Sequence, residues 1–186
     1  MSRLTVTDLK ITGLKLIERQ RLGDARGYLS RLFCAEELAV AGWIKPIMQI
    51  NHTVTPKRGT VRGMHYQVPP HAEMKLVSCI RGQVWDVAID LRVDSPTFLQ
   101  HHAQILSAEN CTAMLIPEGF AHGFQSQSDD CELVYLHSAR YVPPAEAGLR
   151  FDDPRLAIPW PLPLSILSER DQSHPLITGQ FIGINV

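Results

Sequence analysis

Apolar and polar positions alternate in short runs through the middle of the chain, and turn residues separate the runs. Alternation with a period of two is typical of β-strands that bury one face. The expected strands cover residues 11–17, 28–33, 46–54, 60–66, 73–80, 83–91, 103–106, 112–116 and 132–138. Helical signal is weak and confined to residues 35–41 and 164–170. Many short strands without long helices between them predict an all-β sandwich or barrel.

The segment from Tyr141 to the end of the chain has a different character, because proline is frequent and alternation is lost. We expect it to wrap over the barrel as ordered loops, since its apolar side chains need burial: Phe151, Ile158, Trp160, Leu162 and Leu164. A chain of 186 residues has the size of one domain with a substantial core. We therefore predict a single domain over residues 1–186.

Composition and charge exclude several classes of protein. The formal net charge of −1 gives no overall attraction to nucleic acid, although local Arg and Lys residues can still bind a small anion. No apolar run reaches the length of a transmembrane helix, and the polar segment Met1–Lys10 lacks the apolar core of a signal peptide. The four widely spaced cysteines favour reduced thiols over a disulfide framework. These features predict a cytoplasmic protein without membrane or nucleic-acid partners.

Asp86 lies in the apolar run Val84–Ile89, where an unpaired carboxylate would be costly. A histidine on a neighbouring strand would satisfy it, and His122 is the natural candidate. Such a pair would orient the imidazole and hold its proton. The alternative is a structural aspartate bonded to backbone amides at a bulge, and the residues alone leave both possibilities open.

Four further side chains are candidates for chemistry. Strict alternation would place Arg62 and His65 on opposite faces, but a bulge at Gly63 would turn both into one cavity. Lys75, if it points inward, would stabilise an oxyanion or hold phosphate. Tyr135 would serve as a general acid if it had a partner and a substrate. The plainer alternatives are a histidine at a barrel rim, a solvated edge-strand lysine and a core tyrosine.

The stretch from Pro117 to His122 has the pattern P-x-G-x-x-H, which is the second half of the cupin signature. The first half normally supplies two histidines as H-x-H and a glutamate, all of them metal ligands. Here that stretch is His65-Tyr66-Gln67, so the second histidine is absent. His65 and His122 alone are too few ligands for a tight site, and we expect no metal.

Together these motifs resemble the dTDP-4-dehydrorhamnose 3,5-epimerase family. The resemblance runs from about Gly13 to Leu176. Its matching segments include residues 24–27, 49–51, 61–67, 75–77, 86–92, 95–97, 107–110, 117–124, 152–154, 160–161 and 168–171. The resemblance implies a cupin-type jelly-roll barrel with short peripheral helices, usually dimeric, with the active site inside.

The resemblance also implies a role for each matching residue. His65 matches the catalytic base, Asp171 the residue that orients it, Tyr135 the general acid, and Lys75 the group that stabilises charge on the C4 oxygen of the sugar. Tyr141 matches a tyrosine that stacks on the nucleotide base. The remaining matches line the nucleotide-sugar site: Arg26, Gln49, Asn51, Arg62, His122 and Glu146.

The expected reaction converts dTDP-4-dehydro-6-deoxy-D-glucose into dTDP-4-dehydro-L-rhamnose, an isomerase reaction on a nucleotide sugar. A C4 ketone acidifies the protons on C3 and C5, so a base can form an enolate whose oxygen needs a nearby cation or donor. Reprotonation from the opposite face inverts the carbon. This chemistry needs no redox cofactor and no metal, and the family implies a homodimer.

Two positions depart from the family pattern. Arg31 replaces a glutamate near the nucleotide, and Gln172 stands where a basic residue is common. These changes leave the enolate chemistry intact but bear on which nucleotide and sugar are bound. The alternatives are a single-centre epimerase, a sugar ketoisomerase, or a non-catalytic sugar-binding cupin.

Overall fold

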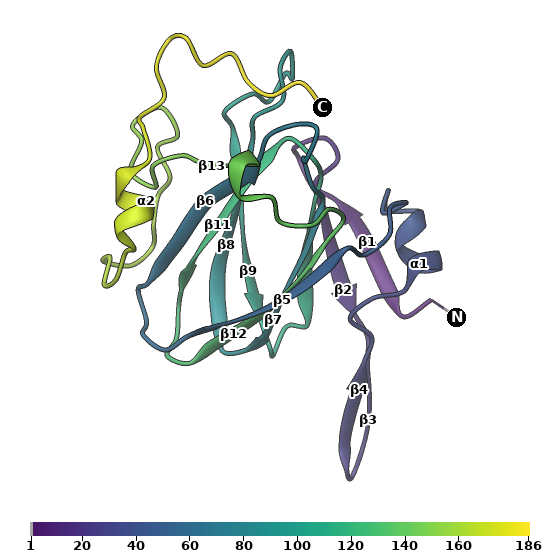
Figure 1. The fold of residues 1–186 in the computed structure, drawn as a ribbon. Helices are drawn as coiled ribbons and strands as arrows, with labels where there is room; N and C mark the ends of the chain where they lie inside the picture. The colour runs from purple at the N-terminus through teal and green to yellow at the C-terminus, as the bar shows by residue number, and fades with distance from the viewer. Residues whose placement is uncertain (1) are drawn as a thin grey trace.

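Two antiparallel sheets face each other in the computed structural model, which describes residues 2–186 (Figure 1). The six-stranded sheet has the spatial order β1 (Leu4–Asp8), β2 (Lys15–Arg19), β10 (Thr112–Ile116), β7 (Lys75–Arg81), β12 (Cys131–His137) and β5 (Gln49–Thr55). The five-stranded sheet has the order β13 (Glu146–Gly148), β6 (Val61–Gln67), β11 (Phe120–Ser126), β8 (Gln83–Asp90) and β9 (His101–Ser107). Consecutive strands from β5 to β8, and again from β9 to β13, alternate between the sheets, as in a jelly roll.

The remaining elements are short and peripheral. A hairpin of β3 (Arg21–Asp24) and β4 (Gly27–Ser30) projects away from both sheets, while α1 (Ala35–Ala39) packs near β1 and β2 (Figure 1). A 3₁₀ turn covers Pro143–Ala145, and α2 (Glu169–Ser173) lies beside β6 (Figure 1). The predicted all-β fold with short helices is thus confirmed. Within residues 2–186 there is no helix of the length and apolarity that crossing a membrane requires.

Most predicted strands are confirmed to within a few residues, but several details differ. Residues 11–14 form a turn ahead of β2, and the short strands β1, β3 and β13 had not been predicted. The second helix is α2, which begins after Ser168 rather than at residue 164. Strand β11 was also missed, because all seven of its residues are buried and its sequence therefore shows no alternation.

The C-terminal segment explains why β11 is covered on both sides. One face of the five-stranded sheet packs against the six-stranded sheet, and the other packs against Leu149, Leu156 and Ile177 of the segment. Trp160 packs edge-on against Trp85 of β8 and donates its indole N–H to the carbonyl of Phe151 at 2.8 Å. The prediction of ordered wrapping loops is confirmed, although Leu164 is exposed and not buried as expected.

A bulge between β6 and β11 at Gly63 has the predicted effect. His65 pairs with His122, and the register then shifts so that Arg62 pairs with Phe124. Gly63 has a φ of 138°, and a Cβ atom there would lie 2.5 Å from the Cα atom of Gly123. A side chain at this position would therefore meet backbone. The bulge places both Arg62 and His65 on the wall of the same cavity.

We predict that Gly63→Ala lowers the free energy of unfolding by roughly 1–3 kcal/mol, because a Cβ atom forces an unfavourable φ and a clash with β11. Urea unfolding of the purified variant measures the change. Gly179→Ala is the matched control, since a Cβ atom there would meet nothing within 4 Å. Equal stability of the two variants would show that the bulge tolerates a side chain.

Candidate active site

A cavity of about 660 Å³ opens between the two sheets. Its volume is in the range that holds a small organic ligand. Ten of the residues singled out by the sequence line it together: Gln49, Asn51, Arg62, His65, Lys75, His122, Tyr135, Tyr141, Glu146 and Asp171. The fold therefore gathers into one place side chains that are up to 122 positions apart, from Gln49 to Asp171.

Strand alternation explains how the six-stranded sheet supplies its part of the wall. On β5 the side chains of Gln49, Asn51 and Thr53 face the cavity, while Ile50 and Val54 face outward and are exposed. Strand β12 pairs with β5 on one side and with β7 on the other. Through this pairing Tyr135 lies opposite Asn51, and His137 lies between Gln49 and Lys75.

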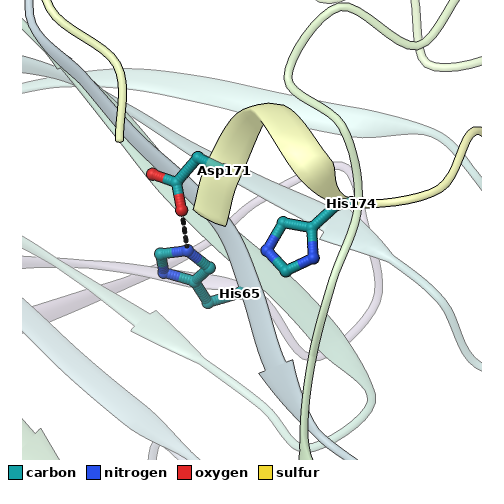
Figure 2. A group of neighbouring side chains, drawn as sticks. All are labelled: His65, Asp171 and His174. Carbon is teal, nitrogen blue, oxygen red and sulfur yellow. Dashed lines mark hydrogen bonds and ion pairs between the residues drawn. The ribbon is translucent and has the colours of Figure 1, made fainter. Parts of the chain in front are cut away.

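His65 and Asp171 form a hydrogen-bonded pair at the wall formed by β6 (Figure 2). The Nε2 atom of His65 lies 2.8 Å from Oδ1 of Asp171, and Ser168 fixes the start of α2 by accepting the Asp171 N–H at 3.0 Å. The carboxylate accepts hydrogen bonds, so Nε2 carries the ring proton. Nδ1 is then the unprotonated nitrogen that can accept a proton from a substrate.

Asp171 is held in its ionised form. Burial opposes ionisation, but the hydrogen bonds from the His65 ring, the Gly63 amide and Ser168 outweigh it and lower the pKa to about 2. The amide of Gly63 donates to Oδ2 at 3.3 Å, so the bulge of β6 contacts the same carboxylate as His65. Asp171 therefore orients the His65 ring throughout the neutral pH range.

Arg170, which sequence reasoning had not singled out, joins this pair to the rest of the cavity. Its guanidinium donates to Oε1 of Glu146 at 2.9 Å and lies 3.2 Å from Nε2 of His65. The motif Ser168-Glu169-Arg170-Asp171 contained the signal, because Arg170 is adjacent to Asp171 in sequence. Arg170 adds a positive charge beside the base.

His65, Asp171 and His174 offer three donor atoms within 4.8 Å of one another, which is a spacing that a metal ion can use (Figure 2). The Arg170 guanidinium, however, lies 3.2 Å from His65 Nε2 and 3.6 Å from Asp171 Oδ1. A cation already interacts with two of the three donors, and a metal would have to displace it. The expectation of a metal-free enzyme stays a prediction.

The predicted pairing of His122 with Asp86 is confirmed. Nε2 of His122 lies 2.8 Å from Oδ1 of Asp86, and both side chains are buried. Within residues 2–186 the other carboxylate oxygen, Oδ2, has no hydrogen-bond partner, so the alternative of an aspartate bonded to backbone amides is wrong. Asp86 does not itself line the cavity; it holds the ring of His122, which does.

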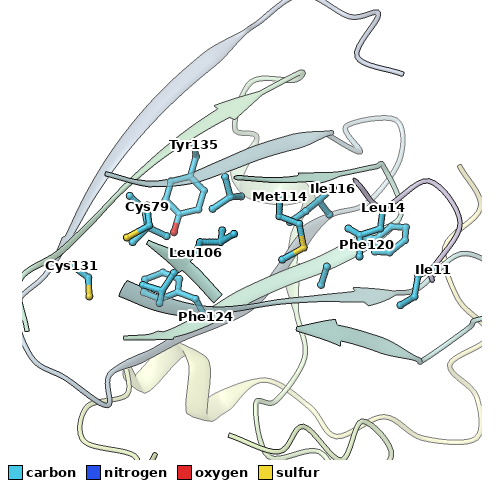
Figure 3. Close-up of a cluster of buried hydrophobic side chains, with 14 residues drawn as sticks. Ile11, Leu14, Cys79, Leu106, Met114, Ile116, Phe120, Phe124, Cys131 and Tyr135 are labelled. Carbon is cyan, nitrogen blue, oxygen red and sulfur yellow. The ribbon is translucent and has the colours of Figure 1, made fainter. Parts of the chain in front are cut away.

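Tyr135 lies where the buried core between the sheets meets the cavity, near Cys79 and Phe124 (Figure 3). Its ring packs edge-on against His122 at a centroid distance of 5.8 Å and stacks on His137 at 6.1 Å. Burial, together with the charge of Asp86, raises the pKa of Tyr135 above its ordinary value. The phenol therefore keeps its proton at neutral pH, as a general acid must.

Lys75 points inward, so the alternative of a solvated edge-strand lysine is wrong. Its ammonium group donates to the carbonyl of His65 at 3.2 Å and pairs with Oε1 of Glu73 at 3.3 Å. The cation thus reaches from β7 on one sheet to β6 on the other. A substrate oxygen near His65 would lie close to this positive charge.

Polar residues at the mouth of the cavity form a connected group. The backbone N–H of Tyr141 donates to Gln49 at 2.9 Å, and Gln49 donates to Asn51 at 3.0 Å. The Tyr141 hydroxyl donates to Glu146 at 2.7 Å. Tyr141 as a whole residue is 48% exposed, so its ring is accessible to a flat ligand.

Three residues with expected roles near the substrate lie away from this cavity. Arg26 is at the tip of the projecting β3–β4 hairpin, bonded to Asp24, and does not line this cavity, so its expected contact with the nucleotide sugar stays a prediction (Figure 1). Arg31 pairs with Glu37, and Gln172 bonds carbonyl groups at the start of α2. The family departures at Arg31 and Gln172 therefore leave the wall of this cavity unchanged.

His137 and Glu73 are two further cavity residues that had no predicted role. His137 accompanies Tyr135 in the alternation of β12, and Glu73 stands two positions before Lys75. These positions indicated that the side chains share a face with known candidates. Their contact with each other, at 2.8 Å, depends on the pairing of β12 with β7 and could not be read from the sequence.

Comparison with known proteins agrees with this geometry. The family model for dTDP-4-dehydrorhamnose 3,5-epimerase matches residues 8–178. The chain belongs to this family. The dTDP-4-dehydrorhamnose 3,5-epimerase of Sinorhizobium fredii is 40% identical, over 90% of this chain and 86% of the relative. The resemblance inferred from the motifs is thereby confirmed.

Two other relatives are similar over most of the chain. The dTDP-4-dehydrorhamnose 3-epimerase of Streptomyces niveus is 38% identical, over 91% of this chain and 82% of the relative. The crystal structure of dTDP-6-deoxy-D-glucose-3,5-epimerase from Legionella pneumophila, in complex with dTDP-4-keto-L-rhamnose, has a TM-score of 0.91. It is 36% identical and covers 98% of this chain and 99% of that chain.

We predict that Asp171→Asn lowers turnover of a nucleotide-linked 4-keto sugar by about 10²- to 10⁴-fold, because an amide does not hold His65 in the required tautomer. Steady-state kinetics measure the loss, and Glu169→Gln, an exposed change on the same helix, is the control.

The pH dependence of unfolding gives a second readout of Asp171→Asn. Because the folded pKa is lowered from 3.8 to about 2, the stabilisation by ionised Asp171 is complete above pH 3.8 and is lost toward pH 2. The variant should lack that part of the acid dependence.

Proposed function

We propose that this protein converts dTDP-4-dehydro-6-deoxy-D-glucose into dTDP-4-dehydro-L-rhamnose by inverting C3 and C5 of the sugar. One observation carries the proposal: His65 and Tyr135 project from opposite sheets into one cavity, with the Lys75 ammonium group close to His65. A sugar ring between the two sheets would have a base on one face and an acid on the other. Inversion of a carbon next to a ketone needs this arrangement.

The proposed steps follow from the protonation states of these groups. Nδ1 of His65 removes the proton from C3, and the electron pair of the C–H bond moves through the C3–C4 bond onto the C4 oxygen. Lys75 stabilises the resulting enolate. Tyr135 then gives its proton to the opposite face of C3, and exchange with solvent resets the base and the acid. A shift of the sugar presents C5 to the same pair.

The binding roles proposed for the other residues follow their positions. Tyr141, exposed at the mouth, would stack on the nucleotide base, with Gln49, Asn51 and Glu146 beside it. Arg62, which is exposed, would contact the diphosphate, and the buried His122 would contact the part of the substrate deeper in the cavity. The complex of the Legionella relative with dTDP-4-keto-L-rhamnose supports a dTDP-linked substrate.

We also propose that the protein is a homodimer and that its hairpins complete the partner's sites. Arg26 resembles a substrate ligand but lies on a hairpin that projects away from its own cavity. Tyr28 and Leu29 of the same hairpin are exposed apolar side chains, which a second copy of the chain would cover. Arg26 would then reach a nucleotide bound in the partner.

The remaining proposals concern the chain as a whole. We propose that it acts as one domain, because the family model spans residues 8–178 without interruption. A cytoplasmic location is supported by the free thiols of all four cysteines, three of which are buried.

A second candidate function is inversion at C3 alone. The 38% identical relative from Streptomyces niveus is a dTDP-4-dehydrorhamnose 3-epimerase, so the family includes single-centre enzymes at this level of similarity. The base–acid pair proposed here serves either reaction. The number of inverted centres depends on whether the sugar shifts within the cavity after the first inversion.

We predict that Tyr135→Phe blocks inversion more severely than proton removal. The ring remains to fill its place, and only the hydroxyl group is lost. In deuterated water with dTDP-4-dehydro-6-deoxy-D-glucose, the variant should incorporate deuterium at C3 with retained configuration, because His65 can return a deuteron to the face it serves. The wild-type protein should show deuterium together with inversion at C3 and C5, as followed by NMR.

The same experiment separates the alternatives. His65→Ala should incorporate deuterium about 10²- to 10⁴-fold more slowly than the wild type, and this is the control for the base. Deuterium at C3 alone in the wild type would assign a single-centre epimerase. Movement of the carbonyl would assign a ketoisomerase, and no exchange would leave a sugar-binding protein. Inversion by Tyr135→Phe at the wild-type rate would remove Tyr135 from the mechanism.

We predict that Arg26→Ala and His65→Ala complement each other in mixed dimers. A site with intact His65 in one subunit would receive intact Arg26 from the other, so each mixed dimer has roughly half of its sites intact in a two-fold assembly. Co-expression with two affinity tags isolates the mixed species for assay. Light scattering gives the oligomeric state, and activity no higher than the sum of the two parent variants would contradict the shared site.

A further inference from the structure

A continuous series of side-chain contacts crosses the six-stranded wall of the cavity, from the loop at Tyr141 to Lys75. The Tyr141 N–H donates to Gln49 Oε1 at 2.9 Å, and Gln49 Nε2 donates to Asn51 Oδ1 at 3.0 Å. Asn51 Nδ2 lies 3.3 Å from His137 Nε2. His137 Nδ1 lies 2.8 Å from Glu73 Oε2, and Glu73 Oε1 lies 3.3 Å from Lys75 Nζ. We call this series the wall relay.

The direction of the wall relay is fixed by its first member. A backbone N–H can only donate, so Gln49 must present its oxygen to Tyr141 and its NH₂ group to Asn51. Asn51 in turn must present its oxygen to Gln49 and its NH₂ group to His137. His137 Nε2 therefore accepts, and the ring is neutral with its proton on Nδ1, from which it donates to Glu73.

The charges in the wall relay are consistent with this assignment. His137, Lys75 and the Glu73 side chain are nearly inaccessible to solvent, at about 10% exposure or less. Burial opposes ionisation of Glu73, but the hydrogen bond from His137 and the charge of Lys75 together bring its pKa below the ordinary value. A neutral His137 leaves one anion and one cation, which balance each other in a buried place.

We propose that His137 is a positioning residue. It holds one carboxylate oxygen of Glu73, so that only the other oxygen contacts Lys75, and it also orients Asn51. This inference rests on the proposed function, in which Lys75 stabilises the enolate oxygen and Asn51 contacts the nucleotide sugar. Without the hydrogen bond from His137, both oxygens of the Glu73 carboxylate would attract the Lys75 ammonium group. The ammonium group is then drawn toward Glu73 and away from the oxygen on which charge develops.

The other groups that face His137 are consistent with a fixed ring. Tyr135 stacks on it with an interplanar angle of 18°, and its strand neighbours are Gln49 and Lys75. The Tyr135 hydroxyl is the proposed acid, so the stack also joins the wall relay to the reacting end of the cavity. His137 thereby contacts a residue of the nucleotide end, the counter-ion of Lys75 and the proposed acid.

Two substitutions separate the two bonds of His137. The amide of asparagine lies near the position of the imidazole Nδ1, so His137→Asn can still donate to Glu73 but has no acceptor for Asn51. The longer glutamine reaches the position of Nε2, so His137→Gln can still accept from Asn51 but has no donor for Glu73. Both variants keep a neutral polar side chain of similar volume.

The expected result is a split between kcat and KM. His137→Gln should lower kcat by about tenfold to a hundredfold, the effect of losing a hydrogen bond to a charged group, with little change in KM. His137→Asn should raise KM by about twofold to tenfold, the effect of losing a neutral hydrogen bond, with a smaller change in kcat. If both variants lowered kcat and raised KM to the same extent, His137 would only fill space, and the proposal would be overturned.

An independent readout does not need activity. Nitrogen-15 NMR of labelled wild-type protein should show a protonated Nδ1 and an unprotonated Nε2 for His137, assigned by loss of the signals in His137→Gln. A protonated Nε2 would overturn the direction of the wall relay whether or not the protein is an epimerase. If the tautomer is as inferred and no substrate turns over, the proposed function fails instead.

The matched control is His52, which bonds Glu132 at 3.0 Å on the outer face of the same sheet. His52→Asn and His52→Gln break the same type of contact outside the cavity. They should leave both kcat and KM at wild-type values. A kcat loss in His52→Gln as large as that in His137→Gln would attribute the effect to the sheet and not to the wall relay.

Discussion

The close approach of β6 and β11 at Gly63 and Gly123 is the constraint on which the site depends. A side chain cannot fit between these strands, and the register shift there directs Arg62 and His65 into one cavity. The amide freed from the regular ladder donates to Asp171, whose other oxygen bonds His65. One backbone irregularity therefore sets the direction of the proposed base, the docking of α2 and the ionised state of Asp171. On the opposite wall β12 pairs with β7 in regular register from Leu133 to His137, and alternation directs the side chains of this stretch.

Three histidine–carboxylate pairs contribute to the same cavity, yet only one is suited to act as a base. His65 pairs with Asp171, His122 with Asp86, and His137 with Glu73, each at 2.8 Å. The side chain of His65 is 24% exposed, compared with 6% for His122 and 10% for His137. In each pair the carboxylate fixes the tautomer of the ring. Access to the cavity, and not the type of pair, distinguishes the base from the two histidines that hold other groups in place.

The sequence was sufficient for the fold class and for ten of the side chains in the cavity, because short alternating strands and family motifs are local patterns. Strand β11 was missed because the C-terminal segment buries its second face, and that contact is not local. Arg26 was placed in the cavity by its motif, but only three-dimensional structure reveals that its hairpin points elsewhere. The contact of His137 with Glu73 depends on strand pairing between β12 and β7. In each case the missing information was how segments that are distant in the sequence are placed relative to one another.

The distribution of charge explains how a chain with a net charge of −1 can present a site for an anionic nucleotide sugar. Three cationic side chains line the cavity: Arg62, Lys75 and Arg170. Lys75 pairs with Glu73, and Arg170 pairs with both Glu146 and Asp171. Arg62 bonds only neutral oxygens, those of Thr55 and the carbonyl of Val54, and has no ion pair within residues 2–186. A diphosphate can therefore bind Arg62 without breaking an ion pair, whereas binding Lys75 or Arg170 would leave a buried carboxylate without its counter-ion. We therefore propose that the paired cations remain beside the sugar and that Arg62, on the strand of the proposed base, binds the phosphates.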